Sequence, residues 1–244
     1  GTYQTSTGQS TCSDADAGYY VSNSASTSQT ACITGSFQPT TGQTSCLDAD
    51  SGFYVSTIGS ASQYACATGT YQPYSGQSSC LDADAGYYVD TTAATSQTAC
   101  AAGTYQASTG QSSCTDASAG YYVDTIASIS QTACAAGTYQ ASTGQSSCTD
   151  ADAGYYTSSA GSTSQTACAV GTYQPSTGQT SCDDADVGYY VPSTGSSSQN
   201  ACTLGTYQPS TGQSSCIDAS AGYYVYFTAA TNQTACAAGT YQPS

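Results

Sequence analysis

Aromatic and apolar side chains stand at fixed places in a pattern that repeats every 17 residues. Each copy begins with a glycine, and an aromatic side chain follows two positions later, as in Gly18 with Tyr20 and Gly35 with Phe37. Apolar positions show no 3.6-residue period, and glycine, serine, threonine and tyrosine dominate, so the pattern disfavours helix. Segments such as Gly-Thr-Tyr-Gln, Gly-Tyr-Tyr-Val and Ser-Gln-Thr-Ala predict β-strands of about three to five residues.

Turn-forming residues separate the predicted strands of each 17-residue module. In the stretch Pro175-Ser176-Thr177-Gly178, proline presets φ at the second turn position and glycine supplies a positive φ at the exit. Each module is therefore predicted to be a small β-hairpin whose two ends are brought together.

The cysteines impose a longer repeat on these modules. They follow one another at alternating gaps of 20 and 14 residues from Cys12 to Cys236, so two modules make one 34-residue repeat. Leu, Ile, Val and Phe are scarce, and an array grows by copy number without a single large core. We therefore predict an all-β fold, an elongated tandem-repeat rod of short disulfide-linked β-hairpins. Residues 1–244 form one continuous array of about seven repeats, interpreted as a window of a longer array.

Two kinds of module alternate along the chain. In the cysteine module, cysteine stands three residues before the glycine and eleven after it, as at Cys32 and Cys46. In the glutamine module, alanine and glutamine take those two places, as at Ala15 and Gln29. Because both places change together, the simplest physical reason is that they touch, since one cysteine without the other would leave a free thiol.

This alternation favours disulfides across the 14-residue gaps. Each closes a loop of about 15 residues, worth on the order of 3 kcal/mol on the chain-entropy model. Cys12 and Cys236 would then pair outside the chain. The rival pairing crosses the 20-residue gaps, from Cys12–Cys32 to Cys216–Cys236, and closes all cysteines within the chain. The favoured pairs are Cys32–Cys46, Cys66–Cys80, Cys100–Cys114, Cys134–Cys148, Cys168–Cys182 and Cys202–Cys216.

The cysteine spacing indicates disulfides rather than zinc. Structural zinc sites use paired ligands two to four residues apart, and the chain has neither such a cysteine pair nor any histidine. Disulfides in turn imply an oxidising compartment, so we expect a secreted or cell-surface protein.

The charge balance narrows the range of partners. There is no Lys, Arg or His, all 15 acidic residues are Asp, and the net charge is -15. Nucleic acid and anionic membranes are disfavoured because nothing can neutralise phosphate. No apolar run approaches 18 residues, so no membrane insertion is expected in this segment.

Paired aspartates recur in most repeats and are candidate calcium ligands. Asp-x-Asp ahead of glycine can supply oxygen ligands to Ca²⁺, although the full calcium-loop spacing with a closing Glu is absent. The simpler interpretation is that the first Asp accepts turn hydrogen bonds and the second keeps the array soluble. The candidates are Asp14, Asp16, Asp48, Asp50, Asp82, Asp84, Asp150, Asp152, Asp184 and Asp186.

Hydroxyl residues ahead of the turn glycine are candidate sites for covalent glycans. Abundant Ser and Thr near Pro are typical of O-glycosylated stalks, although turn hydrogen bonding and solubility explain the same composition. An N-glycosylation sequon also stands at Asn232-Gln233-Thr234. The O-linked candidates are Thr7, Thr41, Ser75, Thr109, Thr143, Thr177 and Thr211.

Catalysis has few residues to use, and we predict no catalytic site and no resident cofactor. No His or Lys can act as a base, and an Asp pair repeated along a coreless rod does not suit glycoside hydrolysis. The periodic tyrosines could stack on sugars, but they are better interpreted as the small core of each module.

The cysteine-module pattern, Cys-x2-Gly-x-Tyr-x4-Gly-x3-Cys, resembles the ephrin-receptor-like cysteine-rich repeat, a relative of tumour-necrosis-factor-receptor-like modules. The resemblance implies an extracellular array of disulfide-linked β-hairpins with bridges across the shorter gap. In that family the modules join through Cys-x2-Cys, whereas each junction here keeps one of the two cysteines. Ala15 replaces the second at Cys12, and Gln29 replaces the first at Cys32.

We therefore predict a non-enzymatic extracellular structural protein, the stalk of a surface protein or the subunit of a fibre. Its expected partner is itself, through head-to-tail or lateral assembly. The alternative is an adhesin or receptor-like binding ectodomain that uses Ca²⁺ or glycan contacts. Two geometries stay open, because hairpins strung end to end advance up to about 28 Å each and stacked hairpins about 10 Å.

Overall fold

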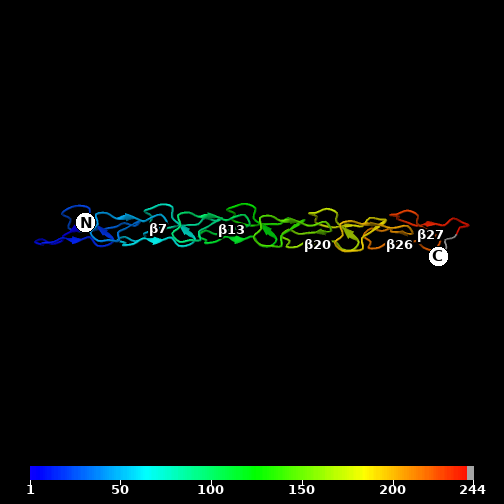
Figure 1. Cartoon of the computed structure of the whole chain (residues 1–244), viewed down its shortest axis with the longest axis horizontal. Coiled ribbons are helices and arrows are strands. Elements are labelled where there is room, and N and C mark those ends of the chain that lie inside the picture. The colour runs from blue at the N-terminus through cyan, green and yellow to red at the C-terminus, as the bar shows by residue number, and fades with distance from the viewer. Residues whose placement is uncertain (241–244) are drawn as a thin grey trace. The chain divides into compact units, whose positions relative to one another are not determined.

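The computed structural model describes residues 1–240, and every regular element within them is a β-strand. Twenty-eight strands of two residues each pair into fourteen antiparallel two-stranded hairpins (Figure 1). The predicted all-β fold of tandem hairpin repeats is confirmed. Across the same residues there is no helix of the length and apolarity that a membrane crossing needs.

The hairpins of the two module kinds alternate along the chain. Those of the cysteine modules are β1 (Thr2–Tyr3) with β2 (Ser13–Asp14), β5 (Ser36–Phe37) with β6 (Leu47–Asp48), β9 (Thr70–Tyr71) with β10 (Leu81–Asp82), β13 (Thr104–Tyr105) with β14 (Thr115–Asp116), β17 (Thr138–Tyr139) with β18 (Thr149–Asp150), β21 (Thr172–Tyr173) with β22 (Asp183–Asp184) and β25 (Thr206–Tyr207) with β26 (Ile217–Asp218). Those of the glutamine modules are β3 (Tyr19–Tyr20) with β4 (Thr30–Ala31), β7 (Phe53–Tyr54) with β8 (Tyr64–Ala65), β11 (Tyr87–Tyr88) with β12 (Thr98–Ala99), β15 (Tyr121–Tyr122) with β16 (Thr132–Ala133), β19 (Tyr155–Tyr156) with β20 (Thr166–Ala167), β23 (Tyr189–Tyr190) with β24 (Asn200–Ala201) and β27 (Tyr223–Tyr224) with β28 (Thr234–Ala235).

The strands are shorter than the three to five residues predicted from sequence, because flanking backbone groups bond to the next module. Gly18 and Val21 stand on either side of β3. The N–H of Gly18 donates to the carbonyl of Gln38 at 2.8 Å, and the N–H of Val21 donates to the carbonyl of Gln43 at 3.0 Å. A hairpin therefore ends its own ladder early and continues it with its neighbour, which satisfies its backbone groups.

A third bond completes each junction between modules. The N–H of Gly42 donates back to the carbonyl of Ala15 at 2.8 Å. Counting each module from three residues before its glycine, 15–31 is a glutamine module and 32–48 is the cysteine module that follows. Equivalent residues make the same three bonds between 32–48 and 49–65. One bonding scheme thus joins both kinds of module.

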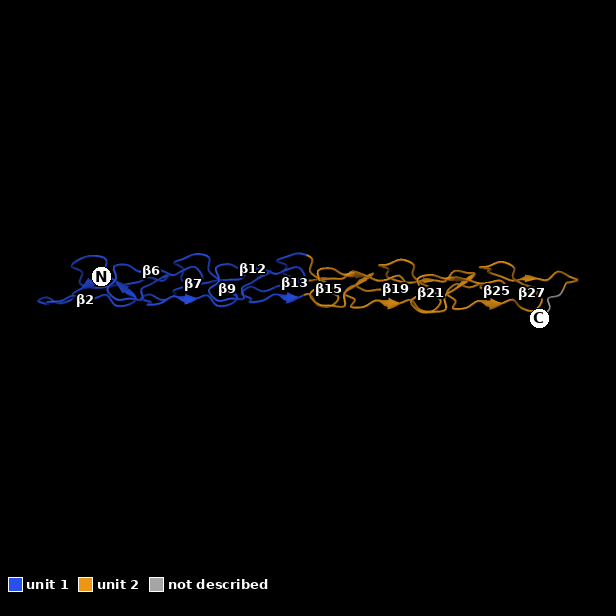
Figure 2. Ribbon diagram, viewed as in Figure 1, with its two compact units in different colours: residues 1–116, 125–130 blue, residues 117–124, 131–244 orange. Residues whose placement is uncertain are grey.

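Two compact units share the chain: residues 1–116 with 125–130, and residues 117–124 with 131–244 (Figure 2). Within each unit the hairpins follow one another in chain order, and the junction bonds recur from module to module.

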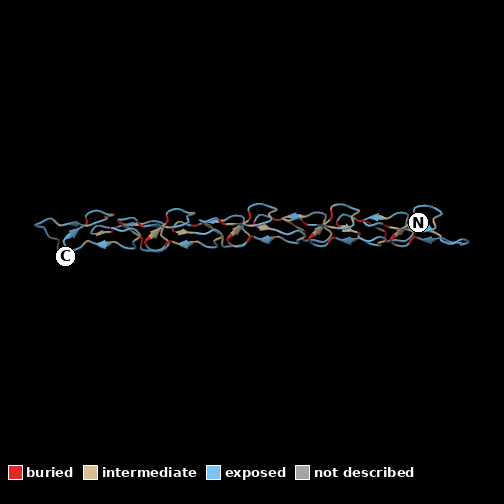
Figure 3. Cartoon of the chain, turned by 180° about the vertical axis from the view of Figure 1, so that it is seen from behind, coloured by how far each residue is buried: buried red, intermediate tan, exposed pale blue. Residues whose placement is uncertain are grey.

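The core of each unit is narrow and built from small side chains (Figure 3). The residue three before the glycine is fully buried, with 0% exposure at Ala15 and Cys32 and at most later copies. Valine three residues after the glycine adds to it in most glutamine modules, as at Val55 and Val191. The strand tyrosines are mostly half-buried, so they flank the core that the sequence had assigned to them.

In most modules, the opening glycine allows a close approach of backbone from two modules away. Gly171 has φ +83°, and a Cβ built on it would overlap the carbonyl oxygen of Gly212. An L-residue with a side chain rarely adopts this φ and would also clash there. The 17-residue glycine period in the sequence is therefore a packing requirement.

Candidate functional site

Six disulfides close the cysteine modules, each between positions 14 residues apart. Their Cα–Cα distances are 5.7–5.8 Å, inside the usual range for a disulfide. Cys202 and its counterparts at the start of each bridge are fully buried, whereas Cys114 and its counterparts at the end are half-buried. The pairs are those that the alternating composition favoured: Cys32–Cys46, Cys66–Cys80, Cys100–Cys114, Cys134–Cys148, Cys168–Cys182 and Cys202–Cys216.

Two cysteines take part in no disulfide among residues 1–240. Cys12 is exposed and Cys236 is half-buried. Each stands at a bridge position whose 14-residue partner would fall outside the chain, so their pairing elsewhere stays a prediction.

A glutamine side chain closes the glutamine modules at the place where the others carry a disulfide. In module 151–167, the Nε2 of Gln165 donates to the Oδ2 of Asp152 at 2.7 Å, and its Oε1 accepts from the backbone N–H of Asp152 at 2.6 Å. This two-point contact, the glutamine clasp, ties together the two ends of the hairpin. It recurs at Gln29 with Asp16, Gln63 with Asp50, Gln97 with Asp84 and Gln199 with Asp186.

Serine replaces the aspartate in the other two glutamine modules. Ser118 still donates its backbone N–H to the Oε1 of Gln131 at 2.6 Å, but the Nε2 of Gln131 reaches the Ser118 hydroxyl only at 3.4 Å. Ser220 and Gln233 repeat this arrangement. The backbone half of the clasp is therefore common to all seven glutamine modules, and the carboxylate half to five.

Sequence reasoning missed the clasp. It interpreted the second aspartate of each pair as a solubilising charge. The available signal was the constant 13-residue separation between the Gln place and an Asp or Ser that directly follows the Ala place. Side-chain amides and carboxylates hydrogen-bond in many settings, so this spacing gains meaning only once the hairpin register is known.

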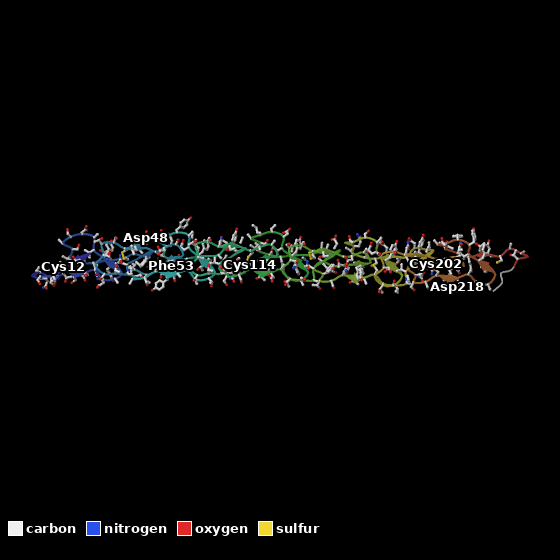
Figure 4. All side chains as sticks on the ribbon, in the orientation of Figure 1. Cys12, Asp48, Phe53, Cys114, Cys202 and Asp218 are labelled. Carbon is white, nitrogen blue, oxygen red and sulfur yellow. A yellow bond between two sulfur atoms is a disulfide. The ribbon has the colours of Figure 1, made fainter. Side chains whose placement is uncertain are left out.

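The glutamine clasp occupies one of the two aspartates that were candidate calcium ligands in each pair. The second aspartate of each pair, such as Asp152, already has one carboxylate oxygen bonded to glutamine. All ten candidate aspartates are exposed, and the first ones lie on strands, as Asp48 does at the end of β6 (Figure 4). Within residues 1–240, no group of three or more His, Cys, Asp or Glu side chains is placed to hold a metal ion.

The candidate glycan acceptors lie on the surface of the units. All seven hydroxyl residues ahead of the turn glycine are exposed, and so is Asn232. Within residues 1–240, hydrogen bonds at these seven positions use backbone groups, as when the Nε2 of Gln145 donates to the carbonyl of Thr143 at 3.1 Å. Their hydroxyls are therefore accessible to modifying enzymes.

A shallow open hollow recurs where a glutamine module meets the following cysteine module. One of about 280 Å³ is lined in part by Tyr20 and Cys46, and another of about 340 Å³ in part by Tyr88 and Cys114. Equivalent positions line both hollows, which lie two repeats apart. Each offers a tyrosine and several small hydroxyl or methyl side chains.

Burial and nearby carboxylates raise the pKa of one tyrosine. Burial of the phenol raises the pKa of Tyr173 above its usual value, and the carboxylates of Asp186 and Asp183 raise it further. At neutral pH this phenol is therefore uncharged, and it can only donate or accept hydrogen bonds.

Comparison with known proteins supports the resemblance seen in the sequence. Residues 120–168 and 188–236 match the family model described as tyrosine-protein kinase ephrin type A/B receptor-like. No curated protein shows significant similarity to the chain. The disulfide-linked modules fit the cysteine-rich repeat pattern of this family. Together, these findings indicate an extracellular or cell-surface domain and are typical of the non-catalytic part of such a protein.

Proposed function

We propose that the chain is an extracellular structural spacer, the stalk of a surface protein or the subunit of a fibre. The observation that carries this proposal is the junction. The same three backbone hydrogen bonds recur between successive modules, at 2.8, 3.0 and 2.8 Å from 15–31 to 32–48. A structure in which each module contacts its neighbours identically can grow by copy number without redesign.

The outer surface suits this role. It presents exposed hydroxyls and carboxylates, while the whole sequence contains no Lys or Arg. Trypsin-type proteases therefore find no cleavage site. O-linked glycans on the exposed turn hydroxyls, from Thr7 to Thr211, would add further hydration and bulk, as in other Ser/Thr-rich stalks.

The spacer function is tested by varying repeat number. Secreted arrays shortened or lengthened by one or two whole 34-residue repeats are compared by small-angle X-ray scattering. We expect the maximum dimension to change by the same increment for every repeat, at most about 56 Å if hairpins run end to end and about 20 Å if they stack. A dimension that stays constant, or that grows only as the cube root of mass, would rule out a spacer.

Self-association is the expected route from spacer to fibre. Repeated identical surfaces favour open, heterologous contacts that propagate into filaments. Sedimentation velocity over a hundredfold concentration range should show growth without a preferred stoichiometry. A single closed oligomer would contradict fibre assembly, and a monomer at all concentrations would restrict the chain to the stalk role.

The recurring hollow favours a second candidate, a receptor-like or adhesive ectodomain. Tyr20 and Tyr88 each present part of a ring beside hydroxyl groups, the kind of surface that stacks on sugars. Binding to a panel of immobilised glycans, with and without calcium, tests this function. Loss of binding in Tyr20→Ala and Tyr88→Ala would support it, and a chelator effect on thermal stability would reveal a calcium site.

A further inference from the structure

Module 219–235 departs from the other glutamine modules at two places at once. Its loop begins with the aromatic residues Tyr226 and Phe227, and Asn232 near the loop's end creates a sequon with Thr234. At the first two places the other modules hold Ser22 and Asn23, Ser56 and Thr57, Asp90 and Thr91, Asp124 and Thr125, Ser158 and Ser159, and Pro192 and Ser193. At the place of Asn232 they hold Ser28, Ser62, Ser96, Ser130, Ser164 and Ser198.

The hairpin brings these two departures to the same part of the module. Tyr224 of β27 faces Thr234 of β28 in the antiparallel register. Two residues further along each arm, Tyr226 and Asn232 begin and end the same loop. The coinciding changes therefore lie across one short loop, although they are six residues apart in sequence.

The aromatic residues form an exposed cluster. Tyr226 is 66% exposed and Phe227 is 44% exposed. The ring centroids of Tyr224 and Tyr226 lie 5.7 Å apart, and those of Tyr226 and Phe227 lie 5.1 Å apart in an edge-on arrangement. The rings support one another, yet much of their apolar surface faces water, which is unfavourable without a covering group.

This exposure comes from the place in the module. The residues at the two equivalent places, all polar except Pro192, are exposed in all six other glutamine modules, and so are the six serines that stand where Asn232 does. Aromatic side chains at such places cannot be part of the core. Their apolar surface is therefore available to a group that covers the loop from outside the module core.

We propose that Asn232 carries an N-linked glycan and that Tyr226 and Phe227 pack beneath its first sugars. In the transfer step, the side-chain nitrogen of Asn232 forms a bond to C1 of the first sugar of a lipid-linked pyrophosphate oligosaccharide. The bond from C1 to the pyrophosphate oxygen breaks, lipid pyrophosphate leaves with the electron pair, and the amide nitrogen releases one proton. Thr234 completes the sequon that the transferase recognises.

The two aromatic side chains would provide a surface on which the sugar packs. The C–H faces of a pyranose ring are apolar, and an aromatic ring offers them a flat, rigid surface. The glycan would thereby cover the exposed rings and hold the loop in one conformation. This inference rests on the proposed extracellular function, because N-glycosylation requires passage through a secretory compartment.

The first test asks whether the glycan is present. The full chain is secreted from a eukaryotic host, and its intact mass is measured before and after treatment with peptide N-glycosidase. We expect a glycan that is absent from Asn232→Gln and from Thr234→Ala. Secreted, folded protein with the bare-chain mass at this site would overturn the proposal while leaving the spacer function untouched.

The second test asks whether the aromatic pair acts through the glycan. Thermal stability is compared for the parent and for Tyr226→Ser with Phe227→Thr, each with its glycan and on an Asn232→Gln background. We expect the aromatic pair to raise Tm by ~2–4 °C only when the glycan is present. Tyr64→Thr, which restores the consensus at an exposed aromatic far from any sequon, serves as the control and should behave alike in both forms. An equal effect of the aromatic pair on both backgrounds would refute sugar packing.

Discussion

At the scale of single residues, glycine recurs at two places in the module for different reasons. One place needs a positive φ together with an empty Cβ position, and the other needs only a positive φ. In most modules, the opening glycine needs both a positive φ and an empty Cβ position, because a carbonyl from two modules away fills that space. The later turn position also has a positive φ but tolerates alanine in four glutamine modules, including Ala93 with φ 56°. A period of glycine in the sequence therefore does not show which glycines are replaceable.

The opening glycines offer a matched pair of substitutions. Gly171 and Gly205 both open cysteine modules with φ near +84°, but only Gly171 faces a backbone carbonyl, that of Gly212. Gly205→Ala should cost about 1–2 kcal/mol from the left-handed conformation alone. Gly171→Ala should cost clearly more, because backbone must move. Chemical unfolding of the two variants measures the difference, and equal losses would contradict the close approach.

At the later turn position, replacing alanine by glycine should increase stability. Ala93 adopts a left-handed conformation that glycine adopts without strain, as Gly161 does at the equivalent place with φ 74°. Ala93→Gly should stabilise the protein by ~0.5–1 kcal/mol, since relief of strain exceeds the added entropy of the unfolded chain. Gly161→Ala should have the opposite sign. Thermal unfolding of both variants measures these shifts, and changes of the same sign would show that φ does not control stability here.

At the scale of the hairpin, two chemistries close the same geometry. The cysteine module uses a disulfide between the residue three before its glycine and the one eleven after, and the glutamine module uses a clasp one residue inside the first place. The sequence predicted the hairpins and the contact between the two places, because the places change together. It could not predict the clasp, because the bond of Gln165 to the backbone of Asp152 depends on a register that composition does not encode.

The equivalence of the closures predicts that a glutamine module can be converted. Ala151 is fully buried, as the first cysteine of each bridge is, and Gln165 stands at the second place. The double variant Ala151→Cys with Gln165→Cys should form a new disulfide worth up to ~3 kcal/mol, reduced by loss of the clasp. Non-reducing mass analysis detects the bridge, and the gain in Tm should disappear under reductant. Two free thiols in the folded variant would disprove the equivalence.

The clasp itself is tested by removing the glutamine. Gln165→Ala leaves the Asp152 N–H without its partner and removes a bond to a carboxylate, so we expect a loss of ~1 kcal/mol for this exposed site. Gln131→Ala should cost less, because its longer 3.4 Å contact reaches a neutral serine hydroxyl. Hydrogen exchange at the Asp152 and Ser118 amides reports each clasp locally. Unchanged exchange in both variants would mean that the clasp does not hold the module closed.

At the scale of the whole molecule, the junctions were beyond prediction because their bonds use only backbone groups. The N–H of Gly18 and the carbonyl of Gln38 leave no signature in residue type, so hairpins could be recognised while their mode of contact stayed open. The same bonds explain why the strands have only two residues, because the flanking backbone groups bond to the next module. The repeat period in the sequence predicts how often modules contact one another, but the hydrogen bonds of each contact depend on backbone geometry.

The charge of the molecule predicts a response to salt. With a net charge of -15 and no Lys or Arg, the carboxylates have only repulsive long-range partners. Raising ionic strength from about 0.01 to 0.15 M shortens the Debye length from about 30 to 8 Å and should raise Tm. Thermal unfolding in sodium chloride measures this, with an uncharged osmolyte as control. A fall in Tm would indicate an attractive electrostatic contact.

The two kinds of module should respond differently to a pulling force, because one is closed by hydrogen bonds and the other by a disulfide. Under a pulling force, a glutamine module held by hydrogen bonds can open and release its full length. A cysteine module keeps the 14-residue loop between its sulfurs out of reach, as between Cys134 and Cys148. The loop closed by each disulfide corresponds to about 50 Å of extended chain, which becomes available only when the disulfide is reduced. The length to which the chain can be extended by force should therefore be greater under reducing than under oxidising conditions.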